Sequence, residues 1–125
     1  MRFIPTKIHG LLDYLLGITL VISPYLLWST EMGWDLWMPM LAGVALILIS
    51  VCTDYEWGAA KTFSMRGHLT MDLLLGILLA ISPWLFGFAD VVFVPFLIFG
   101  AFEIIASLVT KLEPERSGKL GASTL

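Results

Sequence analysis

Four long apolar segments, separated by short polar connections, dominate the pattern of hydrophobic and polar residues along the chain. Each segment is continuously apolar and lacks the strict alternation of a half-buried strand. A helix of about twenty apolar residues spans the bilayer core, and a helix satisfies its backbone polar groups within the segment. We therefore predict an all-α integral membrane protein with four transmembrane helices, at about residues 7–28, 36–53, 68–88 and 91–111.

The first and third segments are copies of one another. Residues 9–28 align without a gap to residues 68–87, and 11 of the 20 aligned residues are identical. Identities at an offset of 57 extend the repeat into the second and fourth segments: Gly43 with Gly100, Ser50 with Ser107, Thr53 with Thr110 and Glu56 with Glu113. The unit is a helical hairpin used twice, at about 7–53 and 66–111. Two such hairpins have the same orientation, and we expect a pseudo-two-fold axis along the membrane normal.

Composition supports a membrane location. The chain is 58% hydrophobic and 14% charged, with a mean hydropathy of +0.91, whereas soluble domains carry about 25% charged residues. Arg2 and Lys7 before the first segment resemble the start of a signal peptide. However, no small-x-small cleavage site follows the segment closely, and its copy recurs at 68–84. We therefore expect the first segment to be retained in the mature protein.

The basic residues predict the orientation in the membrane. All seven lie in the terminal segments or in the central connection, and none lies in the other two connections: Arg2, Lys7, Lys61, Arg66, Lys111, Arg116 and Lys119. By the positive-inside rule, both termini are cytoplasmic. Residues 112–125 are polar and small, and we expect this cytoplasmic tail to be disordered.

A serine–proline pair occurs near the outer end of each repeated segment. Pro24 and Pro83 each remove a backbone hydrogen bond to the carbonyl four residues earlier. The hydroxyls of Ser23 and Ser82 can compensate for the lost bond. We expect a fixed bend at both places, with a gating hinge as the alternative.

The polar residues inside the apolar segments are the candidates for chemistry. His9 and Asp13 are four residues apart, as are His68 and Asp72, so each pair shares one helix face. Glu103 breaks the repeat, because its counterpart at the offset of 57 is a leucine. The carboxyl groups lie at a similar depth, roughly 9–12 Å into the helices from the basic side.

Three functional hypotheses and a structural one fit this cluster. Imidazole and carboxylate groups in a bundle core can hold a divalent transition metal, although the usual signature is Glu-x-x-His. Intramembrane acids can serve a proton- or cation-coupled transporter. Ligation of haem by His9 and His68 has no further support in the sequence. The structural hypothesis, which the sequence favours, is that each His–Asp pair orients its helix and that Glu103 pairs with a histidine or a snorkelling lysine.

The doubled stretch resembles the SPW-repeat family of small integral membrane proteins, named for a Ser-Pro-Trp motif. Ser82, Pro83 and Trp84 reproduce the motif, whereas the first copy has tyrosine at position 25. The resemblance covers residues 7–111. It implies a multi-pass protein of a bacterial or archaeal cell membrane, and it implies no particular activity.

Several classes of function have no support in the sequence. No nucleophile–base set, phosphate-binding loop or basic nucleic-acid patch is present, and the single Cys52 excludes an intramolecular disulfide. We therefore expect a non-enzymatic protein with a structural, assembly or sensor role. Its expected partners are the lipid bilayer and further copies of the chain or other membrane proteins.

Overall fold

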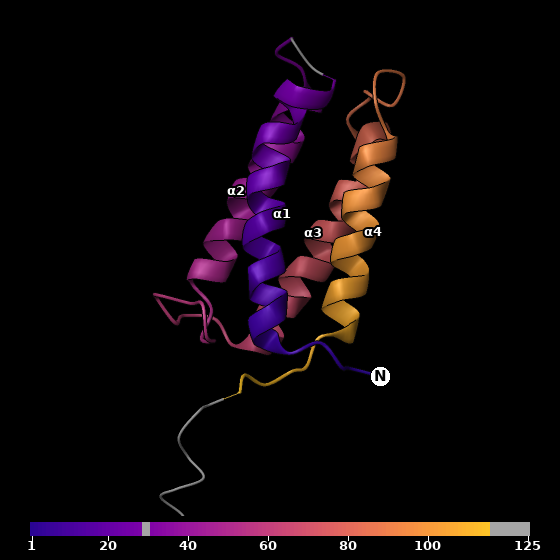
Figure 1. Cartoon of the computed structure of the whole chain (residues 1–125). Coiled ribbons are helices and arrows are strands. Elements are labelled where there is room, and N and C mark those ends of the chain that lie inside the picture. Colours follow the sequence, from indigo (N-terminus) through magenta and orange to yellow (C-terminus); the bar gives the residue numbers. More distant parts are fainter. Residues whose placement is uncertain (29–30, 116–125) are drawn as a thin grey trace, which may run out of the picture.

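The computed structural model describes residues 1–28 and 31–115, which form a bundle of four α-helices (Figure 1). The helices are α1 (Thr6–Leu27), α2 (Trp34–Val51), α3 (Met65–Leu85) and α4 (Val94–Val109). The pairs α1–α2 and α3–α4 form two antiparallel hairpins that begin at the same end of the bundle. The prediction of an all-α protein built from two parallel helical hairpins is confirmed.

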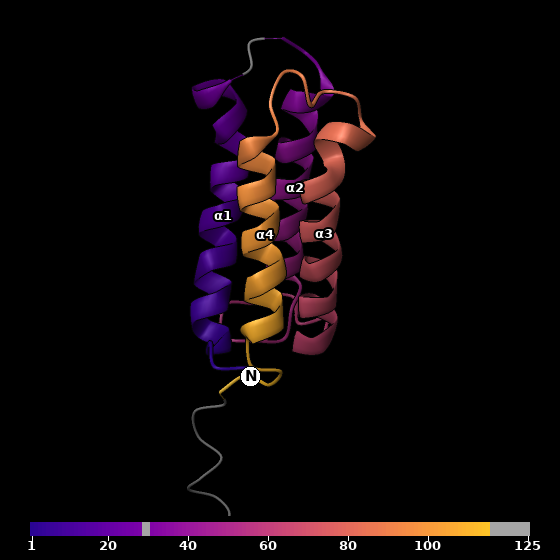
Figure 2. The same ribbon diagram turned by 90° about the vertical axis from the view of Figure 1, so that its right-hand side faces the viewer.

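Three of the helices, α1, α2 and α3, are long and apolar enough to cross a membrane. The fourth has 16 residues and is shorter than the predicted segment 91–111. The chain between α3 and α4 is correspondingly longer than predicted and occupies residues 86–93 (Figure 2). Phe88 in this connection folds back into the core against Phe96, so the chain cannot continue directly into a helix.

Each hairpin is held together by a close approach of two glycines. A methyl group added at Gly43 would lie 2.5 Å from the carbonyl oxygen of Gly17, and one at Gly100 would lie 2.7 Å from the carbonyl oxygen of Gly76. Small residues allow such contact between membrane helices, where van der Waals packing replaces the hydrophobic effect as the driving force. The two contacts occupy equivalent positions in the two repeats.

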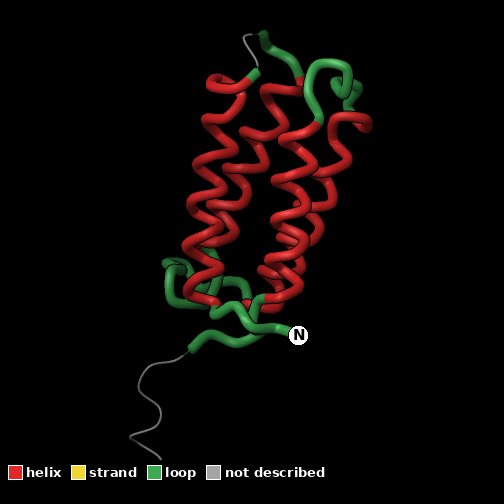
Figure 3. The backbone as a smooth tube through the Cα atoms, turned by 45° about the vertical axis from the view of Figure 1, so that its right-hand side comes forward, coloured by secondary structure: helices red, strands yellow, loops and turns green. Residues whose placement is uncertain are grey.

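The end of the bundle that carries the N-terminus, the end of α4 and the 52–64 connection is here called the basic end. There, the chain entering each hairpin pairs with the chain leaving the other hairpin (Figure 3). Ile4 forms an isolated parallel bridge with Thr110, and Phe63 forms one with Thr53. Because both bridges join equivalent positions of the repeat, they follow the pseudo-two-fold axis that the sequence predicts.

The interior changes character along the bundle. A hydrophobic core fills the half away from the basic end, where its buried residues are Leu16, Leu20, Met38, Ala42, Leu46, Leu79, Phe88 and Phe96. Nearer the basic end, the interior holds histidine, aspartate, threonine and serine side chains. The fold therefore encloses a polar centre beside an apolar one.

The serine–proline pairs lie in the last turns of α1 and α3. The hydroxyl of Ser23 donates to the carbonyl of Leu20 (3.3 Å), and that of Ser82 donates to the carbonyl of Leu79 (2.7 Å). These carbonyls are the ones that Pro24 and Pro83 leave without a backbone donor. Both helices end within three residues of the proline, so little helix lies beyond the motif for a bend to reorient.

The aromatic residues of the two motifs point outward, with 63% of Tyr25 and 55% of Trp84 exposed. At the basic end, Leu112 packs against a small cluster of Tyr55, Met65 and Leu69. The remaining part of the predicted disordered tail, residues 116–125, lies outside the described residues.

Candidate metal centre

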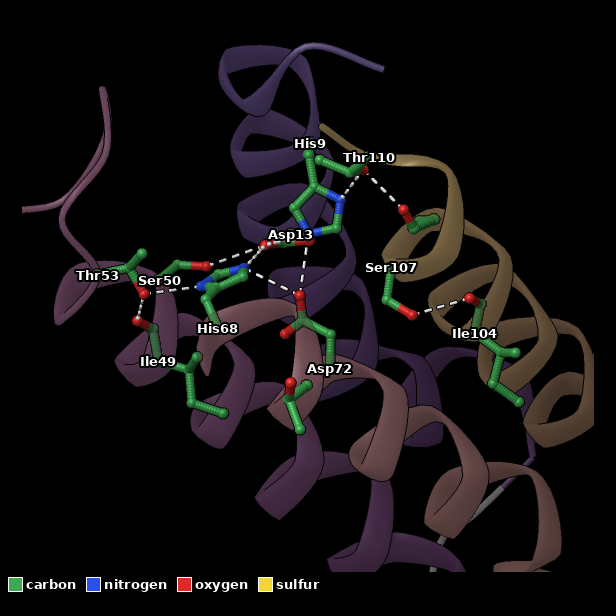
Figure 4. Close-up of polar contacts among 12 residues, drawn as sticks. His9, Asp13, Ile49, Ser50, Thr53, His68, Asp72, Ile104, Ser107 and Thr110 are labelled. Atoms are coloured by element: carbon green, nitrogen blue, oxygen red, sulfur yellow. Dashed lines mark hydrogen bonds and ion pairs between the residues drawn. The ribbon is translucent and has the colours of Figure 1, made fainter. Parts of the chain in front are cut away.

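Four side chains from α1 and α3 meet in the polar half of the bundle (Figure 4). His9 and Asp13 come from one hairpin, and His68 and Asp72 come from the other. All four are at most 1% exposed. Helical spacing places each His–Asp pair on one face, and the packing of the hairpins turns the two faces towards each other.

The contacts of the cluster run both between the hairpins and within each helix. The Nε2 atom of His9 lies 2.9 Å from Oδ2 of Asp72, and the Nε2 atom of His68 lies 2.8 Å from Oδ2 of Asp13. Within each helix, the corresponding distances are 3.3 Å for His9 and Asp13 and 2.9 Å for His68 and Asp72. Both Nε2 atoms therefore face both carboxylates.

The other ring nitrogen of each histidine contacts a threonine of the opposite hairpin. Nδ1 of His68 is 2.8 Å from Oγ1 of Thr53, and Nδ1 of His9 is 2.8 Å from Oγ1 of Thr110. Each threonine hydroxyl also donates to the carbonyl four residues earlier, at 2.7 Å for Thr53 and 2.6 Å for Thr110.

A hydroxyl has one hydrogen, and a carbonyl can only accept, so each threonine must accept from its histidine. The threonines thereby fix both imidazoles with hydrogen on Nδ1. This leaves Nε2 facing carboxylate oxygens. Two acceptors cannot face each other without a proton or a metal ion between them, so each Nε2 shares a proton with a carboxyl group or binds a metal ion.

A divalent metal fits the cluster. The two Nε2 atoms and one oxygen from each aspartate lie within 4.8 Å of one another. In a tetrahedral zinc site with bonds of about 2.0–2.1 Å, ligand atoms lie roughly 3.3–3.4 Å apart. The nitrogen–oxygen distances of 2.8–3.3 Å need to open by about half an ångström to reach this geometry. Two neutral imidazoles and two carboxylates balance a charge of +2, and the threonines supply the outer hydrogen bonds that orient histidine ligands.

A ring of protonated histidines also fits. Two imidazolium groups alternating with two carboxylates are neutral overall, and the cross-hairpin distances match charge-assisted hydrogen bonds. Ser50 donates a further bond to Oδ2 of Asp13, at 3.2 Å. Its counterpart Ser107 instead donates to the carbonyl of Ile104, so the two carboxylates differ in their surroundings.

Haem does not fit between the histidines. Bis-histidine ligation places the two nitrogens on opposite sides of a porphyrin plane. Here both Nε2 atoms share the same two carboxylates, which leaves no room for a macrocycle between them.

Glu103 is buried, with 1% exposure, yet it does not join this hydrogen-bonded cluster. Within the described part of the chain, neither of its oxygens has a hydrogen-bond partner, and the same holds for Oδ1 of Asp72. The expected pairing of Glu103 with a histidine or a lysine is therefore absent among these residues. Its Cβ packs close to Gly76 of α3, within electrostatic range of the cluster.

Sequence reasoning missed the threonines as parts of the site. The signal was present, since Ser50 and Ser107, and Thr53 and Thr110, are identical pairs in the repeat. Tyr55 was also missed: its ring centre lies 5.5 Å from that of His68 and its ring packs against Gly10. Burial raises the pKa of the Tyr55 hydroxyl. The Tyr55 side chain, which packs over the cluster, therefore stays uncharged.

Comparison with known proteins identifies the family of this chain but no particular activity. Neither the curated proteins nor the solved structures include a match to this chain. The family model described as SPW repeat domain matches residues 7–110, which contain all four helices except Thr6, the first residue of α1, and contain the His–Asp cluster. This chain therefore belongs to the SPW repeat family.

Proposed function

We propose that this small membrane protein binds one divalent transition metal ion, of the Zn²⁺ class, between its two hairpins. The ligands are His9, Asp13, His68 and Asp72. The observation that carries the proposal is the fixed orientation of both imidazoles, whose Nδ1 hydrogens are taken by threonines while both Nε2 atoms face the aspartates. A set of four ligands, two imidazole nitrogens and two carboxylate oxygens, favours tetrahedral coordination of zinc or a similar ion.

The role of this ion is structural and the protein is non-enzymatic. Each hairpin supplies one histidine and one aspartate, so the ion joins two units that otherwise meet through helix packing. A ligand that binds only the folded state at a hundred times its dissociation constant stabilises that state by about 2.7 kcal/mol. The ring of protonated histidines is the second candidate, supported by the short cross-hairpin distances, and it would join the hairpins without a metal.

Metal analysis of the purified protein tests the proposal. Protein purified in detergent should contain about one equivalent of metal per chain, or bind it from Zn²⁺ solution, and chelation should lower its melting temperature. His9→Ala and His68→Ala should each abolish binding, whereas Asp90→Asn, in an exposed loop, should retain it. A wild type that neither contains metal nor binds added Zn²⁺ would exclude the metal and leave the protonated ring.

Glu103→Leu is an informative further variant, because leucine occupies the equivalent position 46 of the first repeat. We expect it to keep the metal, since Glu103 makes no hydrogen bond to the cluster in the described structure. Loss of metal from this variant would instead make Glu103 a ligand. Co²⁺ substitution reports the geometry, because a tetrahedral site gives intense visible absorption bands.

We further propose that all four helices span a prokaryotic inner membrane, with both termini in the cytoplasm. The 16 residues of α4 span roughly 24 Å at about 1.5 Å per residue, against a hydrocarbon core of about 30 Å. Packing against the longer α3 supports the shorter helix. The charge distribution supports the orientation, since every basic residue of the described chain lies at the basic end: Arg2, Lys7, Lys61, Arg66 and Lys111. Exposed apolar side chains on all four helices suit contact with lipid or with further copies.

A further inference from the structure

A groove of about 170 Å³ lies at the basic end, between the first turns of α3 and the last turns of α4. Two arginines, Arg2 and Arg66, line it together with leucines that include Leu73 and Leu108. The groove is separate from the His–Asp cluster. Its combination of two guanidinium groups and an apolar wall is the feature that suggests a ligand.

Arg2 is fixed in the groove by the fold. The amide groups of Phe3 and Ile4 donate to the carbonyl of Val109 at 2.7 and 3.1 Å, which holds the N-terminal segment against the end of α4. The Nη1 atom of Arg2 then donates to the carbonyls of Ser107 (2.8 Å) and Thr110 (2.7 Å). A guanidinium has five N–H donors, and within residues 1–28 and 31–115 those on Nε and Nη2 make no hydrogen bond.

Arg66 approaches the same groove from the first turn of α3. Its one ion pair in the described structure is with Glu113, at 4.0 Å, and both side chains are more than two-thirds exposed. Exposed pairs of this kind contribute little free energy. A stronger anion can therefore replace Glu113 as the partner of Arg66.

We propose that this groove binds the headgroup of an anionic phospholipid. The free donors of Arg2 and the guanidinium of Arg66 contact the phosphate, and the acyl chains lie along Leu73 and Leu108. Arginines bind phosphate through parallel N–H donors, and basic pockets between helices on the cytoplasmic side suit anionic headgroups. A lipid fits better than free phosphate because the wall on the bilayer side is apolar, with Leu108 50% exposed.

The internal repeat supplies a matched control. At the offset of 59, Arg2 corresponds to Lys61, and Arg66 corresponds to Lys7. Neither lysine lines the groove, and Lys61 lies 3.8 Å from a carboxylate oxygen of Asp54. Replacing both lysines thus removes the same charge from the same end of the bundle and leaves the groove intact.

Lipid retention in nanodiscs of phosphatidylcholine with a minor fraction of phosphatidylglycerol tests the proposal. Native mass spectrometry of the released protein should show retained phosphatidylglycerol in the wild type and in Lys7→Gln/Lys61→Gln. In Arg2→Gln/Arg66→Gln, the preference for phosphatidylglycerol should fall about tenfold or more. Added inorganic phosphate should not displace the lipid.

Three results would overturn the proposal: no preference in the wild type, an equal loss in the lysine variant, or displacement by inorganic phosphate. Arg2 also bonds the end of α4, so its replacement can disturb folding. Arg66→Gln alone is the second variant, because its side chain makes no backbone bond within the described residues, and it should still weaken retention severalfold. Unchanged retention in this variant would equally exclude the site.

Discussion

The hydroxyl groups of Thr53 and Thr110 determine how the two histidines of the His–Asp cluster are oriented. Because Thr53 and Thr110 donate their hydroxyl hydrogen to a helix carbonyl, they can only accept from the histidines, and both Nε2 atoms turn to the aspartates. A serine or threonine in a membrane helix commonly bonds the carbonyl four residues earlier. Here this local hydrogen bond also fixes the orientation of the two imidazole rings, because it leaves each threonine able only to accept from its histidine.

We predict that Thr53→Val and Thr110→Val each weaken metal binding by about 10–100-fold, the usual cost of losing an outer-shell partner. Each substitution also leaves a buried Nδ1–H without an acceptor, which should lower stability by about 1–3 kcal/mol. Zn²⁺ titration and thermal unfolding in detergent measure the two effects.

Thr19→Val is the matched control for the threonine variants. Thr19 makes the same bond to the carbonyl of Leu15, at 2.7 Å, but it is exposed and contacts no histidine. Its replacement should leave Zn²⁺ affinity unchanged. If it weakens binding as much as Thr53→Val does, the outer hydrogen bond is not the cause.

At the scale of the helices, glycine pairs set the distance within each hairpin. The α1–α2 contact at Gly17 and Gly43 and the α3–α4 contact at Gly76 and Gly100 bring backbone against backbone. A backbone carbonyl cannot rotate away as a side chain can, so an added methyl group has to push the helices apart. The His–Asp cluster lies close to these contacts along the bundle and depends on the spacing they set.

Gly43→Ala and Gly100→Ala should therefore each destabilise the bundle by about 1–3 kcal/mol. Unfolding in a graded mixture of detergents measures the change. Gly67→Ala is the control, since a methyl group there meets only the Ser64 hydroxyl, at 3.4 Å, and should change stability by less than about 0.5 kcal/mol. Equal destabilisation at all three positions would exclude close helix contact as the cause, because loss of glycine flexibility by itself stabilises a helix.

In the molecule as a whole, the pseudo-two-fold arrangement places the N-terminus and the end of α4 at one end. Each hairpin is closed by a segment of the other, through the bridges of Ile4 with Thr110 and of Thr53 with Phe63. The polar centre lies just inside this closed end, and the apolar core fills the other. An even number of membrane crossings follows if the bundle spans the bilayer as one unit.

Single-cysteine labelling tests the four crossings. In a Cys52→Ala background, an impermeant maleimide applied from the periplasmic side should label Asp90→Cys but not Thr62→Cys or Glu115→Cys. Thr62 and Glu115 belong to the basic end, and our proposal that this end faces the cytoplasm rests on the positive-inside rule. Labelling of Glu115→Cys together with Asp90→Cys would mean three crossings, with α4 not spanning the membrane.

Four helices and their pairing into two hairpins could be predicted from the sequence alone, although α4 is shorter than predicted. These properties follow from segment length, periodic spacing and the repeat, all of which are local or periodic along the chain. The sequence also placed His9 beside Asp13 and His68 beside Asp72, because residues four apart share a helix face.

The groups that meet between helices follow from the tertiary structure and could not be predicted from the sequence pattern. His9 contacts Asp72 and Thr110, at separations of 63 and 101 residues, and no spacing rule predicts such partners, because they depend on the rotation and distance of packed helices. The lack of a hydrogen-bond partner for Glu103 among the described residues and the short α4, beside the inward-folded Phe88, likewise depend on helix packing. Side-chain partners across a bundle are set by how its faces pack, and packing is a property of all four helices together.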